Sequence, residues 1–146
     1  HDPSLVVRPT EVEQLGQVVK RCYEEGIPMT VRGSGTNLTG GTIPDCSDTI
    51  VILTTGLNKI LEINTEDLYA TVQPGVITAK FAAAVAAKGL FYPPDPGSMS
   101  VSTIGGNVAE SSGGLRASST ARPKITSWAW KSSPTPVIWW RRAPAP

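Results

Sequence analysis

The sequence lacks any long apolar run, since no stretch approaches the roughly 18 consecutive apolar residues of a membrane-spanning helix. No signal-peptide pattern stands at its start. The formal net charge of +1 indicates no strong attraction to nucleic acid or to a membrane surface. We therefore expect a protein without a membrane span and with a cytoplasmic location, while peripheral attachment to a membrane in a larger complex stays open.

Cysteine and histidine are scarce. Only Cys22, Cys46 and His1 represent these two residue types. Their spacing matches no zinc or redox motif, so no metal site is expected. Cys22 falls on the apolar face of a predicted helix, which favours a reduced thiol in the core.

Glycine, tryptophan and acidic residues are each absent from one part of the chain. No glycine follows Gly114, no tryptophan precedes Trp128, and residues 117–146 carry no aspartate or glutamate. This last segment also shows neither the 2.0-residue period of a strand nor the 3.6-residue period of a helix. We predict a partial domain over residues 1–116 and an irregular tail over residues 117–146.

Two hypotheses address the tail. Its arginines, lysines and tryptophans suit nucleic-acid phosphates and bases, but its prolines break any regular platform for them, and we expect no nucleic-acid partner. The second hypothesis is a one-base frameshift near Ala117–Ser118. Read one base earlier, the codons of residues 119–121 can encode Lys-Tyr-Gly, and those of residues 125–133 can encode Asp-Tyr-Val-Leu-Gly-Leu-Glu-Val-Val. Because this hidden segment has a strand pattern, the DNA sequence of the region tests the hypothesis.

A helix is predicted where apolar residues recur at helical spacing through residues 12–22. Thr10-x-x-Glu13 before it has the form of a capping box, in which the threonine and glutamate side chains bond each other's backbone N–H groups. Gly26 is predicted to end the helix as its C-terminal glycine. These three signals together indicate both ends of the element.

The rest of the first 116 residues combines strand patterns with two further helices, which favours an α+β fold. Thr78 is predicted to cap a helix that Gly89 ends, and a short helix is predicted between the two Gly-Gly pairs of residues 101–114. Residues 64–67 are predicted to form a turn between two strands. The predicted strands are residues 5–8, 27–31, 49–53, 60–63 and 69–72.

Residues 31–41 form the most informative motif, Val-Arg-Gly-Ser-Gly-Thr-Asn-Leu-Thr-Gly-Gly. Its glycines permit positive φ and let several backbone N–H groups approach one point, which suits a phosphate or pyrophosphate. A P-loop is excluded because the chain has no Gly-Lys pair. A Rossmann loop starting at Gly33 is also excluded, because Leu38 occupies the third glycine position and no long helix can follow.

Four motifs carry a family resemblance by their order and spacing. They are Arg-Gly-Ser-Gly-Thr-Asn-Leu-Thr-Gly-Gly (32–41), Val-Gln-Pro-Gly-Val (72–76), Pro-Pro-Asp-Pro-Gly-Ser (93–98) and Thr-Ile-Gly-Gly-Asn-Val-Ala-Glu (103–110). They resemble the FAD-binding domain shared by p-cresol methylhydroxylase and vanillyl-alcohol oxidase, and most of all the FAD-binding subunit of glycolate oxidase and the related D-lactate dehydrogenases. The resemblance covers about residues 5–116. It implies two small α/β subdomains that hold FAD between them, here in truncated form.

The resemblance also implies a cofactor site. Backbone amides and hydroxyls of the first motif would cradle the pyrophosphate, while the later motifs would line the flavin and its ribityl chain. A flat ring requires backbone without side chains on one face and short hydroxyls at its polar edge. The predicted pyrophosphate residues are Gly33, Ser34, Gly35, Thr36 and Asn37, flanked by Arg32 and Leu38. The predicted flavin residues are Gly97, Ser98, Ser102, Thr103, Gly105, Gly106 and Asn107.

The activity implied by the resemblance is oxidation of a 2-hydroxy acid, of the glycolate or D-lactate type, to a 2-oxo acid. Noncovalent FAD is expected, since the sole histidine lies far from every motif in the sequence. Substrate and catalytic residues of that family lie mostly in a later domain, so no catalytic residue is assigned here. Partner subunits of an oxidase complex are expected for the full-length protein.

Two alternatives accompany this interpretation. The chain is either a working part of an oxidoreductase or a non-catalytic fragment that binds FAD weakly or not at all. Asp95 and Glu110 can also be taken as an acid/base pair. We interpret them instead as structural groups, with Asp95 holding the proline-rich bend and Glu110 capping a helix or facing solvent.

Overall fold

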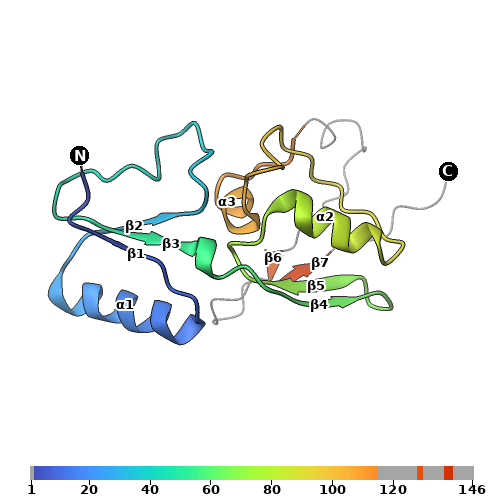
Figure 1. The fold of residues 1–146 in the computed structure, drawn as a ribbon, viewed down its shortest axis with the longest axis horizontal. Coiled ribbons are helices and arrows are strands. Elements are labelled where there is room, and N and C mark those ends of the chain that lie inside the picture. The colour runs from blue at the N-terminus through green and yellow to red at the C-terminus, as the bar shows by residue number, and fades with distance from the viewer. Residues whose placement is uncertain (1, 115–127, 130–136, 140–146) are drawn as a thin grey trace.

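A computed structural model of the chain describes residues 2–114, 128–129 and 137–139. This part is a mixed α/β fold of two adjoining units, each built on its own sheet (Figure 1). The predicted tail lies outside the described residues except for two short strands, β6 (Trp128–Ala129) and β7 (Val137–Trp139). The codons that the offset frame would read as a strand belong mostly to residues outside the described ranges.

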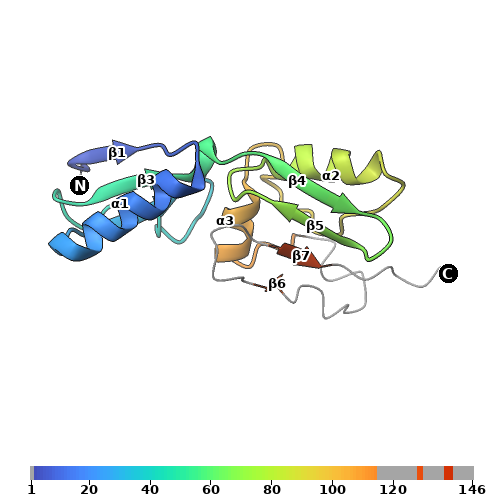
Figure 2. The ribbon, with the colours of Figure 1, turned by 90° about the horizontal axis from the view of Figure 1, so that it is seen from below.

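The first unit is a parallel sheet covered by one helix. Its strands lie in the order β1-β3-β2, and the register pairs Val6 and Thr30 with Val51 of the central strand. Helix α1 lies along one face of this sheet, as Figures 1 and 2 both show. The elements are β1 (Leu5–Val7), α1 (Val12–Glu25), β2 (Met29–Arg32) and β3 (Ile50–Leu53).

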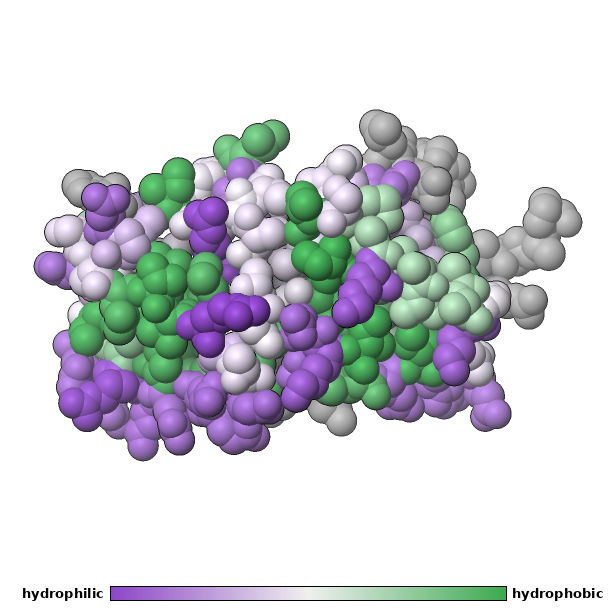
Figure 3. Space-filling view, in the orientation of Figure 1, coloured by the Kyte–Doolittle hydropathy of each residue, from purple (hydrophilic) through white to green (hydrophobic). Residues whose placement is uncertain are grey.

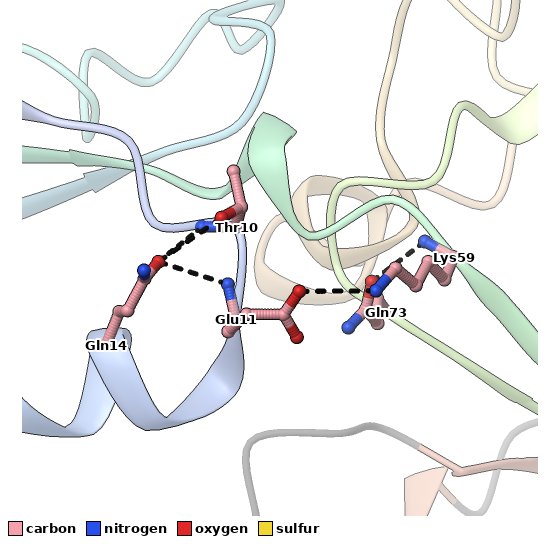
Figure 4. Close-up of polar contacts among 5 residues, drawn as sticks. All are labelled: Thr10, Glu11, Gln14, Lys59 and Gln73. Atoms are coloured by element: carbon pink, nitrogen blue, oxygen red, sulfur yellow. Dashed lines mark hydrogen bonds and ion pairs between the residues drawn. The ribbon is translucent and has the colours of Figure 1, made fainter.

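Helix α1 starts one residue later than the predicted capping box. Glu11, not Thr10, is its N-cap, and the Oε1 atom of Gln14 accepts the N–H groups of Thr10 and Glu11 at 2.9 and 3.2 Å (Figure 4). The prediction that Glu13 closes the box was therefore wrong. The amide of Gln14 supplies the same kind of acceptor one position further along the chain. At the other end, Gly26 adopts the predicted left-handed conformation with φ 65°.

The second unit is an antiparallel sheet with two helices. Strands β4 (Ile60–Asn64) and β5 (Tyr69–Val72) form a hairpin, and the sheet order is β4-β5-β7-β6. The predicted turn between them is confirmed, since Asn64 Oδ1 accepts the N–H groups of Glu66 and Asp67. Helix α2 (Thr78–Ala86) covers the sheet, and α3 (Ile104–Ala109) lies toward the first unit (Figure 2). A short 3-10 helix, η1 (Thr54–Gly56), joins the two units.

The apolar core is concentrated in the second unit. Phe81, Val85 and Ile104 are fully buried there against residues of β5. In the first unit, Cys22 lies in the core as predicted, with 2% of its surface exposed. Leu5 on β1 stays about half exposed. Figure 3 shows a hydrophobic patch on the first unit.

One contact between the two units is an exposed ion pair. Lys59 Nζ lies 3.4 Å from Glu11 Oε1, while the backbone N–H of Lys59 donates to Gln73 Oε1 at 2.8 Å (Figure 4). The Lys59–Glu11 ion pair is more than half exposed on both sides, so it contributes at most about 1 kcal/mol. The side-chain amide of Gln73 is buried. Its bond to the backbone of Lys59 holds the chain just after β5, where the 72–76 motif lies.

Tyr92 gives the first testable prediction. Its hydroxyl is buried without a hydrogen-bond partner, and burial raises the pKa of the phenol above 10.0. The unfolded chain ionises this phenol near pH 10, whereas the folded chain keeps it neutral there. The free energy of unfolding therefore falls as the pH rises above about 10. Tyr92→Phe is expected to remove this alkaline loss and to raise the free energy of unfolding at pH 7 by about 1 kcal/mol.

Denaturant unfolding at pH 7 and pH 10.5 measures both effects. Tyr23→Phe is the matched control, because 83% of that side chain is exposed. Equal responses of the two variants would show that the Tyr92 hydroxyl is satisfied in solution.

Candidate functional site

The Gly-rich loop (residues 33–42) follows β2 and reaches toward α3 (Figure 1). Backbone N–H groups from Ser34 to Thr39 donate to no other residue in the described part of the chain. Unpaired N–H groups on a Gly-rich turn form a favourable environment for an anion. The predicted pyrophosphate loop therefore retains the donors that this role requires.

Ser34 adds a more specific signal. Its Oγ atom is buried and has no hydrogen-bond partner. Buried side-chain hydroxyls are nearly always paired, so an orphan one indicates a missing ligand or water. A phosphate oxygen is a suitable acceptor for this hydroxyl, which makes Ser34 the residue that fits an FAD pyrophosphate best.

The side chain of Asn37 makes hydrogen bonds within the loop. Its Oδ1 accepts the N–H of Gly40 at 3.0 Å, and its Nδ2 donates to Thr42 Oγ1 at 2.8 Å. The amide thus braces the loop internally, as asparagine does in turns. The backbone N–H of Asn37 is left for a ligand, as the sequence prediction requires.

The two flanking residues differ in placement. The guanidinium of Arg32 lies against the backbone of Gly35, where an added Cβ would be 2.6 Å from Cζ. Leu38 is fully exposed at the tip of the loop. Arg32 therefore belongs to the predicted loop site, whereas Leu38 makes no comparable contact within it.

Gly33 and Thr103 bring the first and last motifs together. A Cβ at Gly33 would collide with Thr103 Oγ1, so the two segments pack without room for a side chain. Thr103 is the N-cap of α3, and its hydroxyl accepts the N–H of Gly106 at 3.3 Å. The loop is therefore seated directly on the start of α3.

Gly105 packs against the Val-Gln-Pro-Gly-Val motif. Its N–H donates to the Pro74 carbonyl at 2.8 Å, and an added Cβ would be 2.7 Å from Pro74 Cβ. This close approach alone requires a glycine, in addition to the flat-ring reason predicted from the sequence. Gly97, by contrast, faces open space, where an added Cβ would meet no atom within 4 Å.

Ser102 and Asn107 form a buried network with Thr78. Thr78 Oγ1 lies 3.0 Å from Ser102 Oγ and accepts Asn107 Nδ2 at 2.6 Å. Thr78 was predicted to cap α2, but Ile77 is the N-cap and the Thr78 hydroxyl bonds across to the 98–107 region instead. No local signal identifies this role, because its partners lie 24 and 29 residues away.

The proline-rich bend joins the same cluster. The N–H of Asp95 donates to the Gly113 carbonyl at 3.0 Å, and Asp95 pairs with Gly114 as an isolated bridge. The Ser98 carbonyl accepts the N–H of Ser102 at 2.7 Å. All four motifs of the sequence analysis therefore meet around α3, which Figures 1 and 2 place between the loop and α2.

Glu110 is the C-cap of α3, and its Oε1 accepts the hydroxyl of Thr39 at 2.9 Å. The prediction that it caps or faces solvent is confirmed, although the bond to the loop was not foreseen. Within the described ranges, no three histidine, cysteine, aspartate or glutamate residues gather as metal ligands. No helix in the described part is long and apolar enough to cross a membrane.

Known proteins match this chain in sequence and in fold. Glycolate oxidase subunit GlcD of Bacillus subtilis (strain 168) is 53% identical over 114 residues, and D-lactate dehydrogenase of Anaerostipes hadrus is 40% identical over 115 residues. These matches cover 78% and 79% of this chain but 24% of each relative, so the chain spans about a quarter of their length. A solved structure of alkyldihydroxyacetonephosphate synthase shares the fold with a TM-score of 0.76 at 23% identity, over 93% of this chain and 26% of that one.

Family membership follows from a match to a family model. Residues 3–122 match the family described as FAD binding domain. That range contains every motif seated around α3, and the family implies FAD as the cofactor of this fold. With the unpaired N–H groups and the Ser34 hydroxyl in place for an anion, the chain belongs to the FAD binding domain family.

Proposed function

We propose that this chain holds FAD noncovalently, as part of a flavin-dependent oxidoreductase that converts a 2-hydroxy acid to a 2-oxo acid. The observation that carries the proposal is the buried, unpartnered hydroxyl of Ser34 in a loop with unpaired N–H groups. The pyrophosphate would be bound by residues 33–37. The flavin would lie toward Gly97 and the α3 segment, between the two units.

The N-termini of two helices, α2 and α3, already donate to carbonyls of the chain. The first N–H groups of α2, on Thr78 and Ala79, donate to carbonyls of Ser102 and Met99. Those of α3 donate to carbonyls of residues 72–76. Helix N-termini are the usual alternative for binding phosphate, and the remaining one, that of α1, carries the acidic side chains of Glu11 and Glu13. The Gly-rich loop is therefore the favoured place for the pyrophosphate.

In a flavoprotein the cofactor and the protein have separate tasks, which supports a binding role for this chain. Bound FAD supplies the hydride acceptor, while the protein binds and orients it. The curated relatives are named for glycolate and D-lactate, which supports the glycolate or D-lactate type of substrate proposed here. Because the chain spans about a quarter of these relatives, we place substrate binding in the remaining three quarters.

Partner subunits and location follow the same argument. A relative named as a subunit supports assembly of the full-length protein into an oxidase complex. We propose a cytoplasmic complex, with any membrane attachment supplied by another subunit. We also propose that residues 117–146 are read out of frame. The DNA sequence of that region tests this proposal.

Ser34→Ala gives the second prediction and tests the proposed function. Removing a buried unpaired hydroxyl is expected to leave the flavin-free chain as stable as before, or about 1 kcal/mol more stable. FAD affinity is expected to fall by about tenfold, because a charge-assisted hydrogen bond to the pyrophosphate is lost. Titration of the purified chain with FAD, followed by flavin fluorescence, measures the affinity.

Ser47→Ala is the matched control, since Ser47 is exposed and lies outside the loop motif. A wild-type chain that retains no flavin on gel filtration would favour the alternative of a non-binding fragment. Retained flavin with an unaltered affinity in Ser34→Ala would place the pyrophosphate elsewhere.

A further inference from the structure

We propose that α3 sets the shape of the Gly-rich loop by holding it at both ends, and that Thr39 and Glu110 are positioning residues for the cofactor. The proposal rests on the proposed FAD binding and deepens it. Neither residue belongs to the predicted set of cofactor contacts. Their hydrogen bond holds one end of the loop segment 33–39, and the Gly33–Thr103 contact holds the other end.

The two anchoring contacts lie at opposite ends of α3. Gly33 packs on Thr103, the N-cap, and Thr39 donates to Glu110, the C-cap. At about 1.5 Å per residue the helix axis between these caps is about 10 Å long. The loop segment from residue 33 to residue 39, fully extended, would reach about 20 Å. The segment therefore has about twice the length it needs and must bow away from the helix between its anchors.

The bowed segment contains the candidate hydrogen-bond donors for a ligand. It carries the run of N–H groups without acceptors in the described part of the chain, together with the buried Ser34 hydroxyl. Asn37 braces the distal half of the loop through Gly40 and Thr42, but those bonds stay within the loop. The bond from Thr39 to Glu110 is thus the one that ties the braced half to α3. Without it, the segment that carries these donors would be held to α3 at one end only.

Electrostatics argues against a simpler role for Glu110. A carboxylate at the C-terminal end of a helix interacts unfavourably with the helix dipole. It also adds negative charge near a loop that would receive an anion. Neither place favours the carboxylate, and the hydrogen bond to Thr39 is the favourable contact that Glu110 makes. An acceptor oxygen is the required property, so a neutral glutamine can supply it.

FAD dissociation from the whole chain tests the proposal. Glu110→Ala and Thr39→Val remove the bond, and each is expected to speed FAD dissociation by about tenfold, the loss expected of a hydrogen bond to a charged group. The conservative variants Glu110→Gln and Thr39→Ser keep an acceptor and a donor, and they are expected to stay within about twofold of wild type. The double variant Glu110→Ala/Thr39→Val should dissociate no faster than Thr39→Val alone, because that single variant already loses the shared bond, together with the 3.5 Å contacts of the Thr39 hydroxyl to Gly41 and Asn37.

A second measurement separates this proposal from FAD binding itself. The amides of Gly40 and Ile43 are hydrogen-bonded within the loop, so their hydrogen exchange in the flavin-free chain reports how well the loop is held. Faster exchange in Glu110→Ala but not in Glu110→Gln supports the anchoring, even if the wild type retains no FAD. A wild type without FAD would contradict only the proposed function. Exchange and FAD dissociation that both match wild type in Glu110→Ala would overturn the anchoring. A Glu110→Gln variant as impaired as Glu110→Ala would overturn it too.

Discussion

Gly33→Ala is expected to weaken FAD binding by up to about a hundredfold while the chain still folds. The added Cβ would overlap Thr103 Oγ1, so the Gly-rich loop must move off the start of α3. Overpacking of this kind costs about 1–3 kcal/mol, and the upper end corresponds to about a hundredfold in affinity. Titration with FAD measures the loss, and thermal unfolding of the flavin-free chain confirms that the variant is folded.

Two further variants assign the cause of that loss. Gly16→Ala adds the same methyl group in α1, where no atom lies within 4 Å, and should leave FAD affinity unchanged while raising helix stability. Thr103→Ala combined with Gly33→Ala removes the colliding oxygen and leaves the Thr103 Cβ at 3.5 Å from the added carbon. This pair should recover part of the affinity, since Thr103 also caps α3. No recovery would mean that Gly33 is required for its backbone conformation or for a direct ligand contact.

Elements whose signals are local could be predicted from the sequence. The β5 strand has the predicted bounds, and Gly26 ends α1 because the left-handed conformation there depends on one residue. Phe81 and Val85 occupy the buried stripe of α2 because a helical period alone decides which face is apolar. Each of these features depends on residues within a few positions of one another.

Features that depend on distant partners could not be predicted. Thr78 has the form of a helix cap, yet its hydroxyl bonds to a segment that only the folded chain brings near. Glu110 and Thr39 are separated by 71 positions, so nothing in either motif indicates their bond. The α1 capping box shows the smaller error, since Gln14 and Glu13 offer similar acceptors and only the local path of the backbone selects between them.

The glycines of the motifs gain a second explanation from these contacts. Gly105 was assigned to the face of a flat ring, and it is also the point at which α3 touches Pro74. Gly33 was assigned to a phosphate, and it is also the point at which the loop touches α3. A motif can thus indicate the right ligand while part of its composition serves the packing of one motif on another. Gly97, with open space beside it, is the glycine for which a ligand contact is the better single reason.

Phe81→Ala is expected to cause the largest loss of stability, about 3–5 kcal/mol, because a fully buried aromatic ring is replaced by a cavity. The ring lies 4.9 Å from that of Tyr92 in an edge-to-face contact and packs within the core beneath α2. Against a total stability of about 5–15 kcal/mol, this loss leaves little margin. FAD binding should fail with it, because the start of α2 holds residues 98–102 through the Thr78 and Ala79 N–H groups.

Circular dichroism during thermal unfolding measures the effect, with an expected decrease of about 10–20 °C in the midpoint. Phe91→Ala is the matched control, since 57% of that side chain is exposed, and it should lose less than half as much. Added FAD should raise the midpoint of the Phe91 variant and leave that of the Phe81 variant unchanged, since a ligand stabilises only a chain that still binds it. Equal losses in the two variants would show that the second unit is not organised around Phe81, and the seating of the motifs on α2 and α3 would then require another source.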